Sequence, residues 1–215
     1  MTTISDVTRL LLVFLAGCAA SSAVYRGRAI PAGTRVVLWT DPGGFAANHH
    51  GERTGSVRQI VLHYDAAGSA RRCHEVLEAR GLSAHFLVDT DGTVYQTLDL
   101  DGRAWHAGPA NDRSIGIEIA NLGAYPEPME GSVSGEIHGQ LLHQRPFTDA
   151  QYEALARLVP ALCRAFDIPA RAPAATTTVL DGALDYEGVL GHYHLTREKV
   201  DPGPAFEWDR VLVPD

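Results

Sequence analysis

Positive charge, cysteine and long hydrophobic runs are all scarce in this sequence. Lys and Arg number 18 against 26 Asp and Glu, which gives a formal net charge of −8. The chain therefore lacks the basic surface typical of proteins that bind nucleic acid. Its 3 cysteines form no Cys-x-x-Cys pair, which excludes a zinc ribbon and a thioredoxin-like redox motif. The apolar run at residues 10–17 is too short to span a bilayer, since a membrane helix needs about 20 apolar residues.

The remaining composition is that of an ordinary globular protein. The 215 residues are 45% hydrophobic and 20% charged, which fits one domain with at most a short appendage. These proportions exclude a disordered chain and a polytopic membrane protein. The 21 glycines and 12 prolines indicate many turns and loops.

The N-terminal apolar run ends in the sequence LAGC at residues 15–18. This stretch resembles the lipobox of bacterial lipoproteins, and the resemblance implies cleavage before Cys18 and a lipid on its sulfur. An ordinary signal peptide and a frayed apolar start are the alternatives, because the leading segment carries Asp6 and has Arg9 as its single positive charge.

These features divide the chain into three segments. We expect residues 1–17 to be a lipoprotein-type signal peptide, residues 18–34 to be a tether, and residues 35–212 to be one folded domain. No aspartate follows Cys18 directly, so the lipoprotein resemblance implies a lipid-anchored protein of the cell envelope, in the outer membrane and facing the periplasm. If the apolar start is not a signal, the protein would instead be cytoplasmic.

Hydrophobic patterning after the tether predicts strands mixed with two helices. Residues 115–120 alternate, with Glu118 on the face opposite the isoleucines. Thr148 and Gln151 have the spacing of a capping box at the start of the longer helix. We therefore expect an α/β fold with a central sheet. The expected strands are 35–40, 58–64, 84–88, 93–97, 115–120 and 189–192, the expected helices are 69–80 and the segment from 148 onward, and the expected loops are 41–55, 121–145 and 169–186.

Two cysteines lie in the predicted helices, Cys73 in the first and Cys163 in the second. In an oxidising compartment they could form a disulfide. Two buried free thiols are the alternative, because the sequence does not give the separation of the two helices.

Three residues have the side chains and the context of a catalytic metal site. His63 ends an apolar strand, His192 follows Gly191 at the end of another strand, and Asp201 opens a rigid Asp-Pro-Gly-Pro turn. Zinc hydrolases often use three protein ligands and an open water position, and the ion lowers the pKa of that water to about 7. The spacing alone is weak, because a single strand histidine is usually structural.

Four further segments stand in a recognisable order. They are IVLHYDA (60–66), SAHFLVDTDGTVYQ (83–96), AWHAGPANDRSIGIEIAN (104–121) and GHYHLTREKVDPGPAFEW (191–208). Together they resemble the zinc-dependent N-acetylmuramoyl-L-alanine amidases, the family of the AmpD-type amidases, phage T7 lysozyme and the peptidoglycan recognition proteins. The resemblance implies a single domain with a central mixed β-sheet flanked by helices and a zinc ion (Zn2+) in a groove. It also implies hydrolysis of the amide between the lactyl group of N-acetylmuramic acid and L-Ala of the stem peptide, in peptidoglycan or muropeptides.

The resemblance also assigns roles to individual residues of this chain. His63, His192 and Asp201 match the family's zinc ligands, with His194 as the alternative to His192. We favour His192 because Gly191 lets the end of its strand approach closely.

Two charged residues match the family's catalytic groups. Glu118 in the IGIE motif matches the carboxylate that moves a proton from water to the leaving amine. Lys199 matches a lysine that stabilises the oxyanion of the tetrahedral intermediate. Without the motif, each would be read as a solvated surface residue.

The substrate is expected to lie against residues flanking these positions. We expect Tyr64, His106 and Asn111 to contact the peptidoglycan or muropeptide. The other expected partner is the membrane through the lipid anchor; we expect no nucleic acid, and a monomer. Some recognition proteins keep this fold without catalysis, so a non-catalytic peptidoglycan-binding module is the alternative function.

Overall fold

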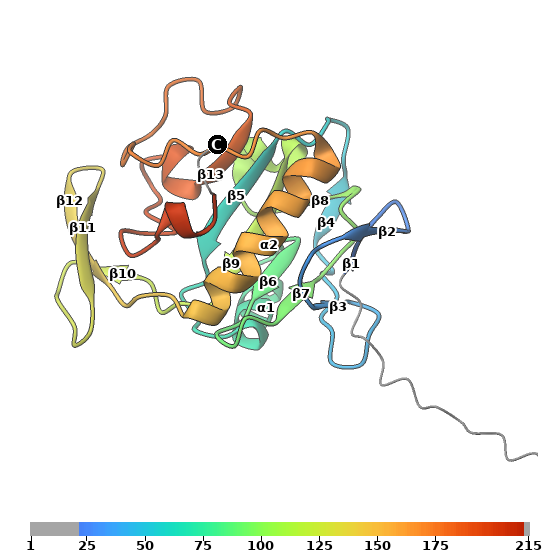
Figure 1. Cartoon of the computed structure of the whole chain (residues 1–215), viewed down its shortest axis with the longest axis horizontal. Helices are drawn as coiled ribbons and strands as arrows, with labels where there is room; N and C mark the ends of the chain where they lie inside the picture. Colours follow the sequence, from blue (N-terminus) through green and yellow to red (C-terminus); the bar gives the residue numbers. More distant parts are fainter. Residues whose placement is uncertain (1–21, 213–215) are drawn as a thin grey trace, which may run out of the picture.

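A computed structural model describes residues 22–212 of the protein (Figure 1). The predicted signal peptide at 1–17, the lipidation site Cys18 and the first residues of the predicted tether lie outside the described residues.

A mixed six-stranded sheet forms the centre of the domain, in the order β13-β5-β9-β6-β7-β3. The strands from β13 to β6 are parallel, β6 and β7 pair as an antiparallel hairpin, and β3 is parallel to β7. The prediction of a mixed central sheet is therefore confirmed. The strands span Val36–Leu38 (β3), Gln59–Tyr64 (β5), Phe86–Val88 (β6), Val94–Gln96 (β7), Ser114–Ile119 (β9) and Gly188–Gly191 (β13).

The two α-helices cover opposite faces of this sheet (Figure 1). The apolar side of α2 (Asp149–Phe166) packs on the isoleucines of β9, whereas α1 (Ala70–Ala79) packs on Leu87 of β6. Because side chains alternate along a strand, Glu118 points to the side of α1, away from the isoleucines. The capping box predicted for α2 is confirmed by the reciprocal bonds of Thr148 and Gln151.

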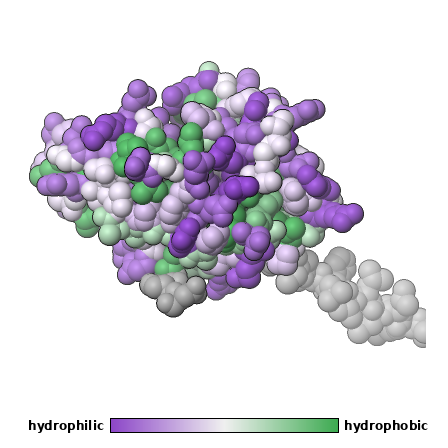
Figure 2. Space-filling view, turned by 90° about the horizontal axis from the view of Figure 1, so that it is seen from above, coloured by the Kyte–Doolittle hydropathy of each residue, from purple (hydrophilic) through white to green (hydrophobic). Residues whose placement is uncertain are grey.

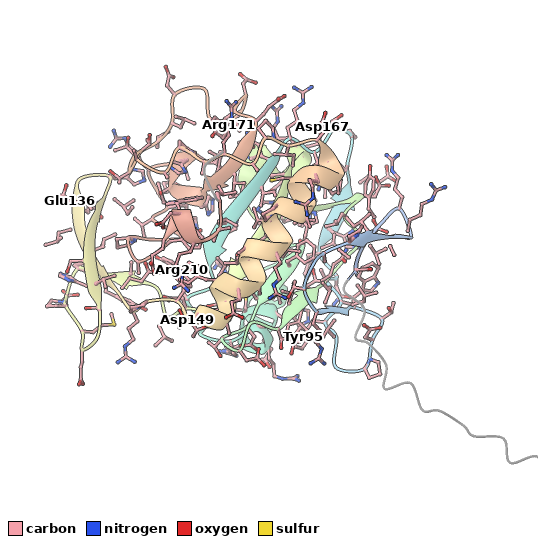
Figure 3. All side chains as sticks on the ribbon, in the orientation of Figure 1. Tyr95, Glu136, Asp149, Asp167, Arg171 and Arg210 are labelled. Atoms are coloured by element: carbon pink, nitrogen blue, oxygen red, sulfur yellow. The ribbon has the colours of Figure 1, made fainter. Side chains whose placement is uncertain are left out.

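The beginning of α2 is also held by an ion pair. Arg210 donates to Asp149 at 2.7 Å, and Figure 3 shows the two side chains together at this end of the helix. Short 3-10 turns complete the helical structure, at Gly108–Arg113 (η1), His192–His194 (η2) and Trp208–Arg210 (η3).

The structure differs from the tether expected at residues 18–34. Here β1 (Ser22–Tyr25) and β2 (Arg28–Pro31) form an antiparallel hairpin that packs on the domain. Gln96 of β7 is fully buried, and its side chain bonds both backbone groups of Val24 at 2.8 Å. Tyr25 lies edge-on to Phe166 of α2, with 4.8 Å between the ring centroids. The composition of residues 18–34 predicted a tether. It could not reveal the hairpin, because the residues that hold the hairpin, Gln96 and Phe166, lie far away in the sequence.

Two of the expected loops also contain strands. In the first, β4 (His50–Glu52) pairs with β8 (Gly102–Ala104). In the second, a three-stranded sheet projects from the domain and consists of β10 (Ala124–Tyr125), β11 (Val133–Ile137) and β12 (Gln140–Gln144). The turn of this projecting sheet is formed by His138 and Gly139, both with positive φ, as in the tight turns that favour hairpins.

Both described cysteines, Cys73 and Cys163, are buried free thiols and do not pair. Hydrophilic side chains are spread over the face shown in Figure 2, interrupted by smaller apolar areas. Within residues 22–212, no helix has the length and apolar character needed to cross a membrane.

We expect Gln96→Leu to detach the N-terminal hairpin from the sheet. The change removes the partner of the Val24 N–H and leaves the Val24 C=O with only the N–H of Leu100. An unsatisfied polar group costs about 1–3 kcal/mol when buried. Urea unfolding should show a loss of stability of that order, and limited proteolysis should cut the hairpin sooner. Gln140→Leu changes an exposed glutamine and serves as control; equal stability of the two variants would contradict this account.

Candidate active site

Three neighbouring parallel strands place three of the candidate residues, His63, Glu118 and His192, at one edge of the sheet. In the register of β5 and β9, His63 lies directly opposite Glu118. On the other side of β5, β13 ends at Gly191, and His192 follows at once. Parallel strands meet at their carboxyl ends, where α/β sheets commonly form their binding crevices.

The structure brings the three predicted ligands together. One ligand atom each from His63, His192 and Asp201 lies within 4.8 Å of the others, and all three residues are buried. Oδ2 of Asp201 is 2.8 Å from Nδ1 of His63 and 3.0 Å from Nδ1 of His192. Two imidazoles and one carboxylate are a donor set that zinc uses in catalytic sites, so these residues fit a metal ion.

Burial and close charges shift the pKa values of this cluster. Burial is the main cause that lowers the pKa of His63 to about 4, and the neighbouring His192 lowers it further. Burial works to raise the pKa of Asp201, but the side chains of His192 and His63 beside its carboxylate hold that pKa well below its usual value. A neutral imidazole and an ionised carboxylate are the forms that bind a metal.

Gly191 allows a close approach between two segments of the site. A Cβ at this position would lie 2.7 Å from Cδ of Pro202, so a larger residue would displace the turn that starts at Asp201. Glycine at the end of β13 therefore allows the strand and the turn carrying the third candidate ligand to pack together.

A buried glutamine of the projecting sheet clamps the same turn. Gln144 donates to the carbonyl of Pro202 and accepts from the N–H of Ala205, each at 3.0 Å. Gly203 has a φ of +88°, and a Cβ there would lie 2.2 Å from Oε1 of Gln144. The position of Asp201 thus depends on a residue of β12.

His194, the alternative ligand, is held away from the cluster. Its Nδ1 accepts from the N–H of Gly191 at 2.9 Å, and its Nε2 donates to the carbonyl of Thr176 at 2.9 Å. Both ring nitrogens are therefore occupied, whereas His192 belongs to the group of possible metal ligands.

Glu118 and Lys199 share a hollow with the cluster. This hollow has a volume of about 290 Å³ and is lined by both residues and by the three candidate ligands. Burial, followed by the charges of Asp201 and Asp65, raises the pKa of Glu118 well above its usual value. A carboxyl group with a raised pKa can both accept and return a proton near neutral pH.

A second hollow, of about 620 Å³, continues the first one. Both are lined by Trp105, His106, His192 and Lys199, so together they form one groove beside the cluster. The groove offers space beside the candidate metal site for an extended ligand.

The predicted substrate contacts lie at this groove, and two of them already bond to other groups of the protein. Tyr64 lines the first hollow, and burial raises its pKa to about 12. Asn111 lines the second, yet its Oδ1 accepts the N–H groups of His106 and Ala107 at 3.0 and 2.6 Å. The ring of His106 contacts His63, with His106 Nδ1 3.0 Å from His63 Nε2.

Sequence reasoning missed two residues at the site. Arg80, at the C-terminal end of α1, lines both hollows. Ser114, the first residue of β9, is fully buried and contacts His106. Neither residue is part of a sequence motif that would identify it. For Ser114, the alternation of side chains along β9 could have indicated a place at the site, since it puts Ser114 on the same face as Glu118.

Comparison with known proteins gives a family match over most of the chain. The sequence model described as N-acetylmuramoyl-L-alanine amidase matches residues 53–204. The 1,6-anhydro-N-acetylmuramyl-L-alanine amidase AmpD of Haemophilus influenzae is 31% identical over 139 residues, which cover 64% of this chain and 60% of that protein. AmpD of Enterobacter cloacae is 35% identical over 138 residues, which cover 60% and 54%. The chain thus spans a little over half the length of these curated relatives.

A solved structure shows the same fold. It is the complex of the N-acetylmuramyl-L-alanine amidase AmiD from E. coli with anhydro-N-acetylmuramic acid-L-Ala-D-gamma-Glu-L-Lys. It superposes with a TM-score of 0.54 at 23% identity, covering 77% of this chain and 65% of that chain.

We expect buried His194 to make the protein less stable in acid. Burial lowers its pKa in the folded protein to about 4, below the value near 6.5 of an unfolded chain. The unfolded state therefore binds the extra proton first, and stability present above pH 6.5 is lost as the pH falls towards 4. Between pH 6.5 and 5 the loss should be about 1.5 kcal/mol.

Urea unfolding at both pH values, with a chelator present, measures this loss. In His194→Gln the difference in stability between the two pH values should be smaller by that amount, whatever the stability of the variant at pH 6.5. An unchanged difference would show that His194 does not titrate in this way.

Proposed function

This chain belongs to the N-acetylmuramoyl-L-alanine amidase family, and from that premise we propose that it hydrolyses the amide between the lactyl group of N-acetylmuramic acid and L-Ala of the stem peptide. The observation that carries this proposal is the convergence of His63, His192 and Asp201 in one groove with Glu118 and Lys199. The relatives' names describe the same bond, as amidases of N-acetylmuramyl-L-alanine.

Zinc is the metal that we propose for the cluster, held by His63, His192 and Asp201. When bound, such an ion supplies a Lewis acid and makes water more acidic at neutral pH. The ionised form of Asp201, favoured by its two histidine partners, supplies the negative charge that offsets part of the charge of the cation.

Glu118 is the proposed general base and acid. Its carboxylate takes a proton from the attacking water, whose oxygen bonds to the amide carbonyl carbon. When the C–N bond breaks, the same carboxyl returns the proton to the leaving nitrogen, which gives the lactyl carboxylic acid and the free amine of L-Ala. The acid then ionises, and its proton goes to the amine or to water. The raised pKa of Glu118 suits both steps.

Lys199 is the proposed electrostatic partner of the carbonyl oxygen. It is exposed, and it lines both hollows of the groove, so its ammonium can reach a bound ligand. As water adds to the carbonyl carbon, negative charge develops on the oxygen, and a nearby cation stabilises that charge more than it stabilises the neutral amide.

We propose that the substrate is a muropeptide or a peptidoglycan strand. The AmiD complex holds an anhydro-muramyl peptide, and a groove with hollows of about 290 and 620 Å³ has room for a sugar and a peptide on either side of the scissile bond. Tyr64, His106 and Asn111 are the proposed contacts along it.

We further propose that the protein acts in the cell envelope as a lipid-anchored monomer, in the outer membrane and facing the periplasm. The LAGC sequence ending at Cys18 supports the anchor, and the peptidoglycan bond named by the relatives supports the compartment. No nucleic-acid partner is proposed, given the net charge of −8.

Glu118→Gln should abolish hydrolysis while metal remains bound. The amide keeps nearly the shape of the carboxylate but cannot accept the proton, and loss of general acid–base catalysis reduces rates by about 10²–10⁴-fold. Release of stem peptides from purified peptidoglycan, followed by mass spectrometry, measures activity, and elemental analysis measures zinc.

Two further variants make this test specific. Glu136→Gln changes an exposed glutamate of the projecting sheet (Figure 3) and should keep full activity. Asp201→Ala should lose both zinc and activity. Full activity of Glu118→Gln would remove Glu118 from the mechanism, and a parent protein without zinc that leaves muropeptides uncut would favour a binding module.

Cys18→Ser should abolish incorporation of lipid. Cells expressing the full chain are labelled with palmitate, and the protein is immunoprecipitated; label is expected in the parent and not in the variant. Cys73→Ser, which changes a buried thiol, should keep the label. A parent protein without label would contradict the proposed anchor and leave the proposed hydrolysis unaffected.

A further inference from the structure

A chain of hydrogen bonds leads from the backbone to the back of the candidate metal site. Ser114 Oγ donates to the carbonyl of Ala110 at 2.8 Å. A hydroxyl has one hydrogen to give, so the contact between Ser114 Oγ and His106 Nε2 at 3.1 Å requires the imidazole to be the donor. The hydrogen of His106 therefore resides on Nε2.

The same reasoning extends to the next ring. A neutral imidazole with its hydrogen on Nε2 has only an acceptor at Nδ1. His106 Nδ1 lies 3.0 Å from Nε2 of His63, so His63 must donate there. Its own hydrogen then resides on Nε2, and the lone pair of its Nδ1 points towards Asp201, whose Oδ2 is 2.8 Å away.

We propose that His106, fixed by Ser114, is a positioning residue that sets the tautomer of His63 for metal binding. Two lone pairs that face each other at this distance repel, and a cation between them turns that repulsion into attraction on both sides. The inference rests on the proposed metal site. It adds a second role to the substrate contact proposed for His106, because both of its ring nitrogens contact protein atoms.

The position of His106 is built into the fold. Asn111 Oδ1 accepts the N–H of His106 at 3.0 Å and that of Ala107 at 2.6 Å, which fixes the backbone. Gly116 of β9 provides space for the ring, because a Cβ there would lie 2.5 Å from its Cγ. The glycine of the IGIE motif thus allows an imidazole to lie against the strand that carries Glu118.

Such outer hydrogen-bond partners orient metal-binding histidines and raise their basicity. Removing one typically weakens metal binding or activity by about 10–100-fold. The proposal therefore predicts a loss of zinc affinity of this size in His106→Leu. This change removes the hydrogen-bond acceptor and leaves an apolar side chain that still fills the space. His106→Asn should retain most of the affinity, because its Oδ1 can take the place of Nδ1.

Zinc affinity is measured on the full protein by competition with a fluorescent chelator. The metal-free proteins are also labelled with ¹⁵N-histidine, and long-range ¹H–¹⁵N spectra report which ring nitrogen of His63 carries the hydrogen. We expect Nε2 in the parent and in His106→Asn, and a shift of the population towards Nδ1 in His106→Leu. A role in packing alone would change thermal unfolding and leave the tautomer as it is.

The outcomes separate the two proposals. A parent protein that binds no zinc overturns the metal site and this inference with it. A parent that binds zinc, with His106→Leu binding it equally tightly, overturns the inference alone, as does a hydrogen on Nδ1 of His63 in the metal-free parent. If His106→Leu does not fold, Ser114→Ala takes its place, with the same direction expected for affinity and tautomer.

Discussion

A single oxygen atom, Oδ2 of Asp201, lies within 3.0 Å of both His63 and His192, and much of the architecture serves this contact. His63 lies on β5 and His192 directly follows β13, and these two strands are parallel neighbours in the sheet. The aspartate arrives from a turn held by Gln144. Each group alone would be an unfavourable buried polar residue, and their convergence makes the burial tolerable.

The elements that the sequence predicts well are those whose signals are local. The alternation of residues 115–120 identifies β9 and places Glu118 away from the core, and the spacing of Thr148 and Gln151 identifies the start of α2. The N-terminal hairpin and the projecting sheet are different. Their strands are short, and the hairpin depends on distant partners such as Gln96, so local composition cannot distinguish them from loops.

The same distinction applies to the site. Motif resemblance selects the three residues that the structure groups together, and it prefers His192 to His194, whose ring is bonded elsewhere. Sequence motifs do not identify the residues that surround the candidate ligands. Ser114 acts through the direction of one hydroxyl hydrogen, and Asn111, expected at the substrate, has its oxygen engaged by the backbone of His106. Such roles depend on which atoms meet in the folded protein, and the sequence alone does not show this.

The clamp formed by Gln144 limits how this domain can be recombined with its relatives. The segment 121–145 projects from the body (Figure 1) and looks like an exchangeable insertion. A chimera that replaces it without an equivalent of Gln144 would leave the carbonyl of Pro202 and the amide of Ala205 without partners. Crossover points that preserve the candidate metal site must therefore take β12 and the 202–205 turn from the same parent.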